Sequence, residues 1–564
     1  MIRAHFDGAW FWPLRVIALA CAMALSMTLT APPLCAAEIS AVRKDAWDAG
    51  TDAGMAVYRR GLLPSGATLV GRREAGVGVE GPAAACITCH RSSGLGTSEG
   101  RIVVPPIIGK YLFRSHSTNV QDVDAVHVPG YRSTREPYTD ATLAKAIRTG
   151  IGPNGRTLNY LMPRYDLDDG AMASLIAYLK VLTAGPVPGV SNGTLDFATV
   201  ITPDADPVAS KGMLDVMEHF FADKNSFIRG GIRPMNATRE IQYRVSRRWQ
   251  LHEWRLTGGP SEWGRQLDAH LATEPVFAVI SGLGGRDWEP VHQFCQRAAV
   301  PCLFPNVELP VVAENDFYTV YFSRGVLLEA DLIATQLAGR KDQLRRIVQV
   351  YRAGDIGEEA SAALAAQPAL RSLKVERRSL GGSAGNGVDL AQVLQAVGPN
   401  DALVLWLRPN DLATLPTGAS GAAATFMSGS MGGHEHAPVP QGWRAQLRMT
   451  YTIDLPNARN VRMNFPLAWF NIHHIPVVAE RVQTDTYVAC GIMAETLTDM
   501  LDSFVRDYLV ERVEMMLSHR LVNGYYPRLS LAPSQRFASK GGYIVHFSEA
   551  TGTKIEADGD WTVP

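Results

Sequence analysis

Two cysteines and a histidine with a spacing suited to covalent chemistry lie near residue 90. They form the stretch Cys86-Ile87-Thr88-Cys89-His90, a C-x-x-C-H motif. Cysteines at this spacing lie on one side of a helical turn, where their thiols can form thioethers with the vinyl groups of a haem, and the histidine can reach the iron. A redox dithiol does not need the histidine, and a zinc site would want a second Cys or His pair nearby. The motif therefore predicts one covalently bound haem c.

The residues around this motif show helical patterns that could build a pocket for the group. Amphipathic patterns with capping residues cover Gly54–Gly61, Thr139–Gly150 and Asp168–Leu182. Between the second and third lies Leu161-Met162-Pro163, which places a methionine on a short loop whose direction the proline constrains. We expect these helices to enclose the haem, with Met162 on the loop between two of them.

On these residues, segment 46–184 resembles the class I cytochrome c family, with Pro105-Pro106-Ile107-Ile108-Gly109 as a further matching stretch. The resemblance implies a small all-α cytochrome c domain. It also implies that Met162 is the second axial ligand beside His90 and that the carbonyl of Pro105 or Pro106 orients the histidine. An iron-bound histidine needs such an acceptor for its other ring nitrogen.

One departure from the family is an insert from about Tyr111 to Pro137, which contains His116 and His127. Either histidine could in principle replace Met162 as the sixth ligand. Without that replacement, His90 and Met162 fill both axial positions of the iron, which favours transfer of single electrons over chemistry on oxygen or peroxide. We expect a one-electron carrier.

Beyond a Pro/Gly-rich stretch at 185–194, read as a linker, the chain alternates short apolar runs with helical patterns. This alternation predicts parallel sheets covered by helices. The clearest part is Val276–Pro305, in which a strand, a Gly-rich turn, a helix and a second strand follow one another. On this stretch, on Arg345–Val350 and on the late helix Tyr487–Leu501, segment 195–564 resembles type I periplasmic solute-binding proteins of the branched-chain amino-acid branch. The resemblance implies a two-lobed α/β domain with a ligand cleft at the carboxyl ends of the strands.

The residues expected to contact a ligand in that cleft lack the groups that would bind an amino acid. Ser281 follows a strand, but the turn after it lacks the Ser/Thr pair that a carboxylate would want. Arg286 or Arg324 could bind an anion, but we expect each to be a surface or structural arginine. The Gly-rich turn matches neither nucleotide-binding pattern. The sequence therefore leaves a small-molecule ligand in the cleft open and makes amino-acid transport the weaker inference.

Other metal-type and thiol side chains lie in this second half. Cys295 and Cys302, at a helix and at the strand after it, are a candidate disulfide of an exported protein, and Cys490 in an apolar helical run is expected to be a buried free thiol. Met427, Met431, His434 and His436 are soft and imidazole donors suited in kind to copper, though a cleft loop explains them equally. The pair His473-His474 is expected on a strand, where its members would face opposite ways.

The charge balance and the amino-terminal segment narrow the class of protein and its location. The chain has 564 residues, with 54 Lys+Arg against 55 Asp+Glu, a balance that argues against nucleic-acid binding. Residues 1–37 have the charged start, short apolar core and small-residue end of a secretory signal peptide, cleaved near Ala37. A retained anchor or a lipid on Cys35 are weaker alternatives.

Together these features predict a periplasmic monohaem cytochrome with a solute-binding or partner-docking module, no membrane span after cleavage and no catalytic site of its own. A periplasmic redox protein would be its partner. The alternative is a solute receptor for transport or sensing in which the haem monitors redox state.

Overall fold

The computed structural model describes most of the chain after the signal segment. The described residues are 49–74, 76–99, 102–114, 136–229, 247–313, 316–381, 389–501, 503–519, 522–532 and 534–564. The predicted signal peptide 1–37 and the two insert histidines, His116 and His127, lie outside these ranges. Among the described residues, no helix combines the length and the apolar character needed to cross a bilayer.

The first part of the described chain is mainly helical, but it also contains two small antiparallel sheets, so the expectation of an all-α domain is corrected. Its helices are α2 (Ala49–Arg60), α3 (Ile87–His90), α4 (Gly109–Leu112), α5 (Asp140–Thr149) and α6 (Asp169–Val181). Its strands are β1 (Val70–Arg72), β2 (Gly78–Glu80), β3 (Thr97–Glu99), β4 (Ile102–Val104) and β5 (Arg164–Tyr165). Strands β1, β2 and β5 pair in one sheet, and β3 pairs with β4. Strand pairing satisfies backbone groups where the chain reverses between the short helices.

The helix boundaries of this part follow the capping signals in the sequence. The hydroxyl of Thr139 accepts a hydrogen bond from the N–H of Thr142, and Gly150 ends the helix in the left-handed conformation at φ 75°. Asp168 caps α6 by accepting from the N–H of Ala171. Helices α2 and α6 pack closely against each other. Gly54 makes this approach possible, because a Cβ atom there would lie 2.0 Å from the carbonyl oxygen of Ser174.

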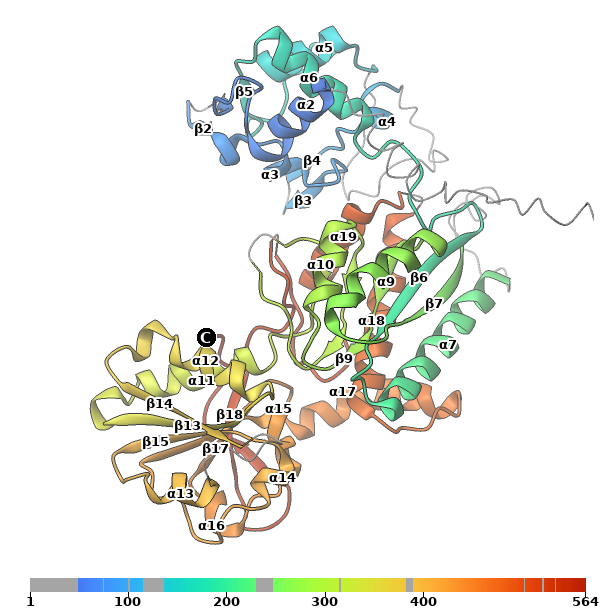
Figure 1. Ribbon diagram of the computed structural model, residues 1–564. Coiled ribbons are helices and arrows are strands. Elements are labelled where there is room, and N and C mark those ends of the chain that lie inside the picture. The colour runs from blue at the N-terminus through green and yellow to red at the C-terminus, as the bar shows by residue number, and fades with distance from the viewer. Residues whose placement is uncertain are drawn as a thin grey trace, which may run out of the picture. The chain divides into compact units, whose positions relative to one another are not determined.

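The first α/β lobe is built on a parallel sheet. Its strand order is β11-β9-β6-β8-β10-β12, with β7 pairing on β6. The strands are β6 (Thr194–Ile201), β7 (Arg248–Arg255), β8 (Ala278–Ile280), β9 (Leu283–Gly284), β10 (Cys302–Leu303), β11 (Asn306–Val307) and β12 (Thr319–Val320). Helices α9 (Pro260–Thr273) and α10 (Glu289–Arg297) pack together, and α7 (Pro207–Arg229) packs against α18 (Glu480–Met500) (Figure 1). This confirms the predicted helix-covered parallel sheet.

The second lobe contains a mixed sheet of order β14-β13-β15-β16-β17-β18-β19. Its strands are β13 (Arg346–Arg352), β14 (Lys374–Leu380), β15 (Asp401–Trp406), β16 (Ala424–Met427), β17 (Leu447–Tyr451), β18 (Tyr543–Phe547) and β19 (Ile555–Ala557). The first five in spatial order run parallel, whereas β18 and β19 are antiparallel. Helices α11 (Val326–Ala338) and α12 (Gly357–Ala365) cover one face, and α13 (Leu390–Gln395) and α16 (Gln441–Arg444) the other (Figure 1).

The chain passes between the lobes three times: after β12, after β17 and before β18. After β17 it forms α17 (Pro456–Ile472), α18 and α19 (Arg506–His519) before it returns to the second sheet. Two of the crossing segments run side by side, since Tyr321 donates its N–H to the carbonyl of Arg536 at 2.8 Å and Ala538 donates to Tyr321 at 3.0 Å. The two lobes are therefore joined by paired, hydrogen-bonded segments.

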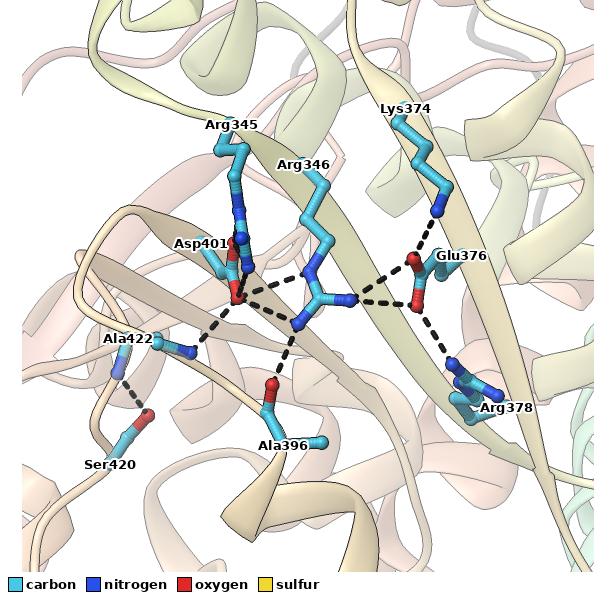
Figure 2. Close-up of polar contacts among 10 residues, drawn as sticks. Arg345, Arg346, Lys374, Glu376, Arg378, Ala396, Asp401, Ser420 and Ala422 are labelled. Atoms are coloured by element: carbon cyan, nitrogen blue, oxygen red, sulfur yellow. Dashed lines mark hydrogen bonds and ion pairs between the residues drawn. The ribbon is translucent and has the colours of Figure 1, made fainter.

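A charged network closes the amino-terminal edge of the second sheet, away from the ends of the strands where a ligand would bind. Asp401 at the start of β15 accepts hydrogen bonds from Arg345 and Arg346, and Arg346 also donates to Glu376 on β14 at 3.0 Å (Figure 2). Lys374 and Arg378 flank Glu376. This network ties three neighbouring strands together and is structural in character.

Candidate functional site

Four of the residues singled out by the sequence line one cavity of about 390 Å³. They are Cys86, Cys89, His90 and Met162. The other lining residues are mostly apolar and come from the β4 region, α5, the methionine loop and α6; they include Ile102, Val104, Leu112, Leu143, Ile147, Leu158, Leu175 and Leu179. The structure thus brings together side chains separated by 72 to 76 positions in the chain.

The imidazole of His90 is buried and held by one hydrogen bond. It is 5% exposed, and its Nδ1 lies 2.9 Å from the carbonyl oxygen of Pro105. Because a carbonyl can only accept, Nδ1 carries the proton and the lone pair is on Nε2. Burial lowers the pKa of His90 to about 4, against the smaller opposing effect of the Pro105 bond. The neutral ring is the form that ligates metals, and Pro105 rather than Pro106 is the acceptor.

The cysteines are placed by the short helix α3. Cys86 precedes its first residue, and its carbonyl accepts the N–H groups of Cys89 at 3.2 Å and His90 at 2.9 Å. Burial raises the pKa of the Cys86 thiol to about 12. Both thiols therefore lie on one turn, at the wall of the cavity, as the motif predicts.

The loop that carries Met162 is fixed from both sides. Asn159 accepts from the N–H of Leu161 through Oδ1 at 2.9 Å and from the N–H of Met162 through its carbonyl at 3.0 Å. Arg164 donates to the carbonyl of Met162. The hydroxyl of Tyr165 donates to the carbonyl of Ala84 at 2.8 Å, which ties the loop to the segment before Cys86. Sequence reasoning missed the roles of Asn159 and Tyr165, and only their closeness to Met162 could have suggested them.

The chemistry of this cavity fits a haem c. It offers two thiols, a neutral imidazole nitrogen and a thioether sulfur, surrounded by aliphatic side chains. Thiolate or thioether sulfur with imidazole nitrogen is a donor set used for haem iron, and an apolar wall suits the faces of a porphyrin. Met172, which the sequence assigns to packing, is 3% exposed and does not line the cavity.

A second cavity of about 530 Å³ lies between residues of the two lobes. The first lobe contributes Asp204, Asp206, Arg286 and Glu308, and the second lobe Asp355, Met431 and Arg408. Arg481, Asp485 and Tyr526, from α18 and a crossing segment, also line it. Loops after β6, β9, β11 and β13 supply most of these groups, as expected for an α/β cleft.

Charges in this cleft are largely paired across it. Arg408 donates to Glu308 at 2.8 and 2.9 Å and to Asp355 at 2.8 and 2.7 Å, and Arg286 pairs with Glu359. The hydrogen bonds to Asp355 and Glu308 hold the pKa of Arg408 well above its usual value. Two of the three lining arginines thus join the lobes.

One carboxyl group in the cleft has an oxygen without a hydrogen-bond partner among the described residues. Asp485 is 4% exposed, its Oδ1 has no hydrogen-bond partner among the described residues, and the nearest cation is Arg481 at 3.7 Å from Oδ2. Burial raises the pKa of Asp485 to about 6, although Arg481 opposes the shift. This carboxyl is suited to accept a hydrogen bond from a bound solute.

The three residues that the sequence offers as weak candidates for ligand contacts, Ser281, Arg286 and Arg324, have partners within the protein. The hydroxyl of Ser281 lies 2.9 Å from the hydroxyl of Thr486 on α18 and accepts from Asn306, so it faces α18 and does not line the cleft. Arg286 lines the cleft but is already paired, and Arg324 pairs with Asp331 at 2.6 Å. Each of the two arginines is thus already paired with a carboxylate, although the Nε of Arg324 has no hydrogen-bond partner among the described residues.

The thiols of the second half also differ from expectation. Cys295 and Cys302 are free buried thiols in this structure, so the candidate disulfide is not formed; both lie in the core of the first lobe, which holds each thiol as an apolar group. Cys490 is a buried free thiol as predicted.

The histidine pair does not lie on a strand. His473 ends helix α17 and lies 3.0 Å from Asp223, so the expected strand at His473-His474 is wrong.

The possible copper ligands do not gather into one site. The side chain of Met427 is fully buried and that of Met431 nearly so, whereas His436 is largely exposed. Within the described ranges, no three His, Cys, Asp or Glu side chains cluster as metal ligands would.

Comparison with known proteins finds similarity only among solved structures, since no protein-family model and no curated protein matches the chain. A fatty acid ABC transporter substrate-binding protein from Thermomonospora curvata is 14% identical, with 67% of this chain and 95% of that chain covered and a TM-score of 0.45. A solute-binding protein of Rhodopseudomonas palustris, in complex with 3,4-dihydroxybenzoic acid, is 13% identical over 66% and 98%, with a TM-score of 0.46.

The substrate-binding protein LivJ of Streptococcus pneumoniae, in complex with isoleucine, is 10% identical over 64% of this chain and 99% of its own, with a TM-score of 0.43. Similarities of this size assign neither a family nor a ligand to the chain.

Proposed function

We propose that this protein is an exported monohaem c-type cytochrome that transfers single electrons and carries a solute-binding module. The observation that carries the proposal is the apolar cavity lined by Cys86, Cys89, His90 and Met162. The signal-like residues 1–37 support export to the compartment where c-type haem is attached. A periplasmic redox protein would be the electron-exchange partner.

The residues of the cavity would each do a separate task. A bound haem would supply a one-electron couple. Cys86 and Cys89 would hold it covalently, and His90, oriented by Pro105 at 2.9 Å, would present Nε2 to the iron. Met162, on a loop fixed by Asn159 and Arg164, would offer its sulfur. The aliphatic wall would limit the access of water and small oxidants to the iron.

Replacing Met162 tests this assignment. The full chain, produced in a host that attaches c-type haem, should keep its haem through acid–acetone extraction. Met162→Ala should keep the covalent haem, lose the weak absorption band of sulfur-to-iron ligation and become high-spin, because one axial position opens. Met55→Ala, a methionine that does not line the cavity, should leave the spectrum unchanged. Absence of that band in the wild type, with an unaltered spectrum for Met162→Ala, would refute sulfur ligation.

The cleft supports a second candidate function, that of a solute receptor for transport or sensing. The observation in its favour is the cavity of about 530 Å³ between the lobes, with the unpartnered Oδ1 of Asp485 in its wall. Calorimetry of the haem-loaded full chain with amino acids, amides and alcohols would test it. Binding that Asp485→Asn weakens at least tenfold would support a receptor role, and no heat with any of these solutes would count against it.

The ion pair across the cleft gives a further prediction. Glu308→Gln removes the first lobe's partner of Arg408 but leaves Asp355 in place. We expect the closed form to lose about 1 kcal/mol, or about fivefold in the closed-to-open ratio, because the pair is partly exposed. Small-angle scattering should show a larger radius of gyration for this variant. Arg297→Ala, which breaks a pair with Asp268 within the first lobe, should not change it.

A further inference from the structure

Three carboxylates in a row on α19 form hydrogen bonds and an ion pair with the residues that directly follow His90. Asp507, Glu511 and Glu514 are spaced so that they lie on one face of the helix. Ser92 donates to Asp507 at 2.6 Å, Ser93 donates to Glu511, and Arg91 pairs with Glu514. The segment after the haem-binding motif is therefore held by a helix that belongs to the second half of the chain.

The three carboxylates of this row differ in how their charge is balanced. Asp507 has Arg59 at 3.3 Å and also accepts from the hydroxyl of Tyr318, and Glu514 is paired with Arg91 and Arg536. Glu511 has no ion pair among the described residues. It accepts the N–H of Ser93 at 2.9 Å and the hydroxyl of Ser93 at 2.6 Å. Its charge is therefore stabilised by neutral donors, unlike the charges of the other two carboxylates.

Glu511 is also buried close to the haem-binding turn. It is 5% exposed, and its partner Ser93 is fully buried. Ser93 lies three residues beyond His90, so at most about 11 Å of extended chain separates their Cα atoms. A charge on Glu511 and a charge on a haem at His90 therefore interact through protein interior, where screening by water is weak.

A cavity of about 140 Å³ lies beside Glu511. Its lining includes the polar residues Arg91, Thr97, Ser98, Tyr508 and Ser518 as well as the apolar Met515 and Leu531. The hydroxyl of Tyr508 and the Nε of Arg512, both at this cavity, have no hydrogen-bond partner among the described residues. The space has room for several waters at these polar groups, by which a proton could reach the carboxylate.

We propose that Glu511 is a redox-linked proton site, which takes up one proton for each electron that enters the haem held by Cys86, Cys89 and His90. This inference rests on the proposed haem function. The balance is simple: the iron goes from ferric to ferrous with an electron from a one-electron donor, a proton from solvent converts the Glu511 carboxylate to the acid, and no net charge is added. The protein then transfers hydrogen equivalents rather than bare electrons.

The electrostatics fix the direction of the coupling. Ferric haem carries one more positive charge than ferrous haem, so it favours the carboxylate, and reduction favours the acid. The groups that face Glu511 are Asp507, Glu514 and Tyr508 on its own helix, Arg512 beside them, Arg91 and Ser93 after α3, and Tyr58 on α2. Burial raises the pKa of Glu511 to about 8, against the opposing effects of Ser93 and Arg91. The proton exchange should therefore occur near neutral to mildly alkaline pH.

The test is the pH dependence of the reduction potential of the haem-loaded full chain, measured by spectroelectrochemistry with soluble mediators. The potential should fall as pH rises around pH 8, with a slope that approaches about 59 mV per unit for one proton per electron. Glu511→Gln should flatten this slope. Ser93→Ala keeps the carboxylate but removes a donor that stabilises it, so the sloping region should move to higher pH. Asp52→Asn, which changes an exposed carboxylate of α2, should leave the slope as in the wild type.

Infrared difference spectra add a direct readout. Reduction should produce the C=O stretch of a protonated carboxyl group, and Glu511→Gln should abolish that band. A wild-type potential independent of pH, or a slope that survives in Glu511→Gln, would overturn the inference, because the proton would then reside elsewhere. If Glu511→Gln does not fold, the shift in Ser93→Ala decides. A chain that binds no covalent haem would instead refute the proposed function, an outcome visible in the absorption spectrum alone.

Discussion

Gly54→Ala is expected to disrupt the pairing of α2 with α6 and to reduce attachment of the proposed haem. A Cβ atom at position 54 would lie 2.0 Å from the carbonyl oxygen of Ser174 and 2.8 Å from the Cβ of Tyr178. The nearest of these atoms belongs to the backbone of α6, so no rotamer change relieves the clash and the helices must separate. Overpacking of this kind costs about 3 kcal/mol.

The consequence for the cavity follows from the role of α6. Leu175 and Leu179 of α6 line the cavity that contains His90 and Met162, and Tyr58 of α2 donates to the carbonyl of Arg91, directly after His90. Separation of the two helices therefore disturbs the cavity from both sides. Hydrogen exchange of the α2 and α6 peptides should become at least a hundredfold faster, and the haem content per chain should fall.

A matched substitution on the same helix pair controls for the alanine itself. Gly170→Ala lies in the first turn of α6, where the nearest atom to the new Cβ is Oδ1 of Asp168 at 3.4 Å. This variant should be as stable as the wild type or slightly more so, because alanine favours the helix over glycine. Equal exchange rates in Gly54→Ala and Gly170→Ala would contradict the close-packing argument.

Asp401→Asn is expected to loosen the second lobe by about 3 kcal/mol, because it leaves the guanidinium of Arg346 without its buried partner. Asp401 is fully buried and accepts from Arg345, Arg346 and the N–H of Gly398. Hydrogen exchange of the β13 and β15 peptides, which this carboxylate joins, should report the loss. Lys374→Ala, which breaks an exposed pair with Glu376 in the same network, should cost no more than about 0.5 kcal/mol.

The effect of Asp401 should depend on pH with a defined sign. Burial raises the pKa of Asp401, but hydrogen bonds from Arg346, Gly398 and Arg345 outweigh it and bring the pKa down to about 2. A carboxyl whose pKa is lower in the folded state stabilises that state above its unfolded pKa and loses the contribution as pH falls through the folded value. The difference between wild type and Asp401→Asn should therefore be constant above about pH 4 and shrink toward pH 2. A difference that stays constant across this range would contradict the pairing.

The short-range features of the cavity around Cys86 and His90 follow from the order of residues alone. The spacing of Cys86, Cys89 and His90 places two thiols and one imidazole on one turn because neighbouring residues of a helix have fixed relative positions. Caps at Thr139 and Asp168 likewise set where α5 and α6 begin, since a side chain two or three residues away satisfies a free backbone N–H. Strand–helix alternation similarly predicts the helix-covered sheets of both lobes.

Contacts between distant segments cannot be predicted in this way. The sequence does not choose between Pro105 and Pro106 as the partner of His90, and it gives no sign that the hydroxyl of Ser281 bonds to Thr486 on α18. It predicts an all-α first domain because strands of two or three residues, such as β5, leave no periodic pattern long enough to detect. Such strands form only because a partner from elsewhere in the chain supplies the hydrogen bonds.

The C-x-x-C-H motif and the helix-covered α/β sheets are therefore visible in the amino-acid sequence. The side chains that share a cavity with that motif, and the carboxylate that lies behind it, are known only from the folded chain. Ser93 and Glu511 are 418 positions apart. Their contact depends on how two crossings between the lobes, after β12 and after β17, bring α19 back to the first part of the chain, and local spacing carries no information about such a path.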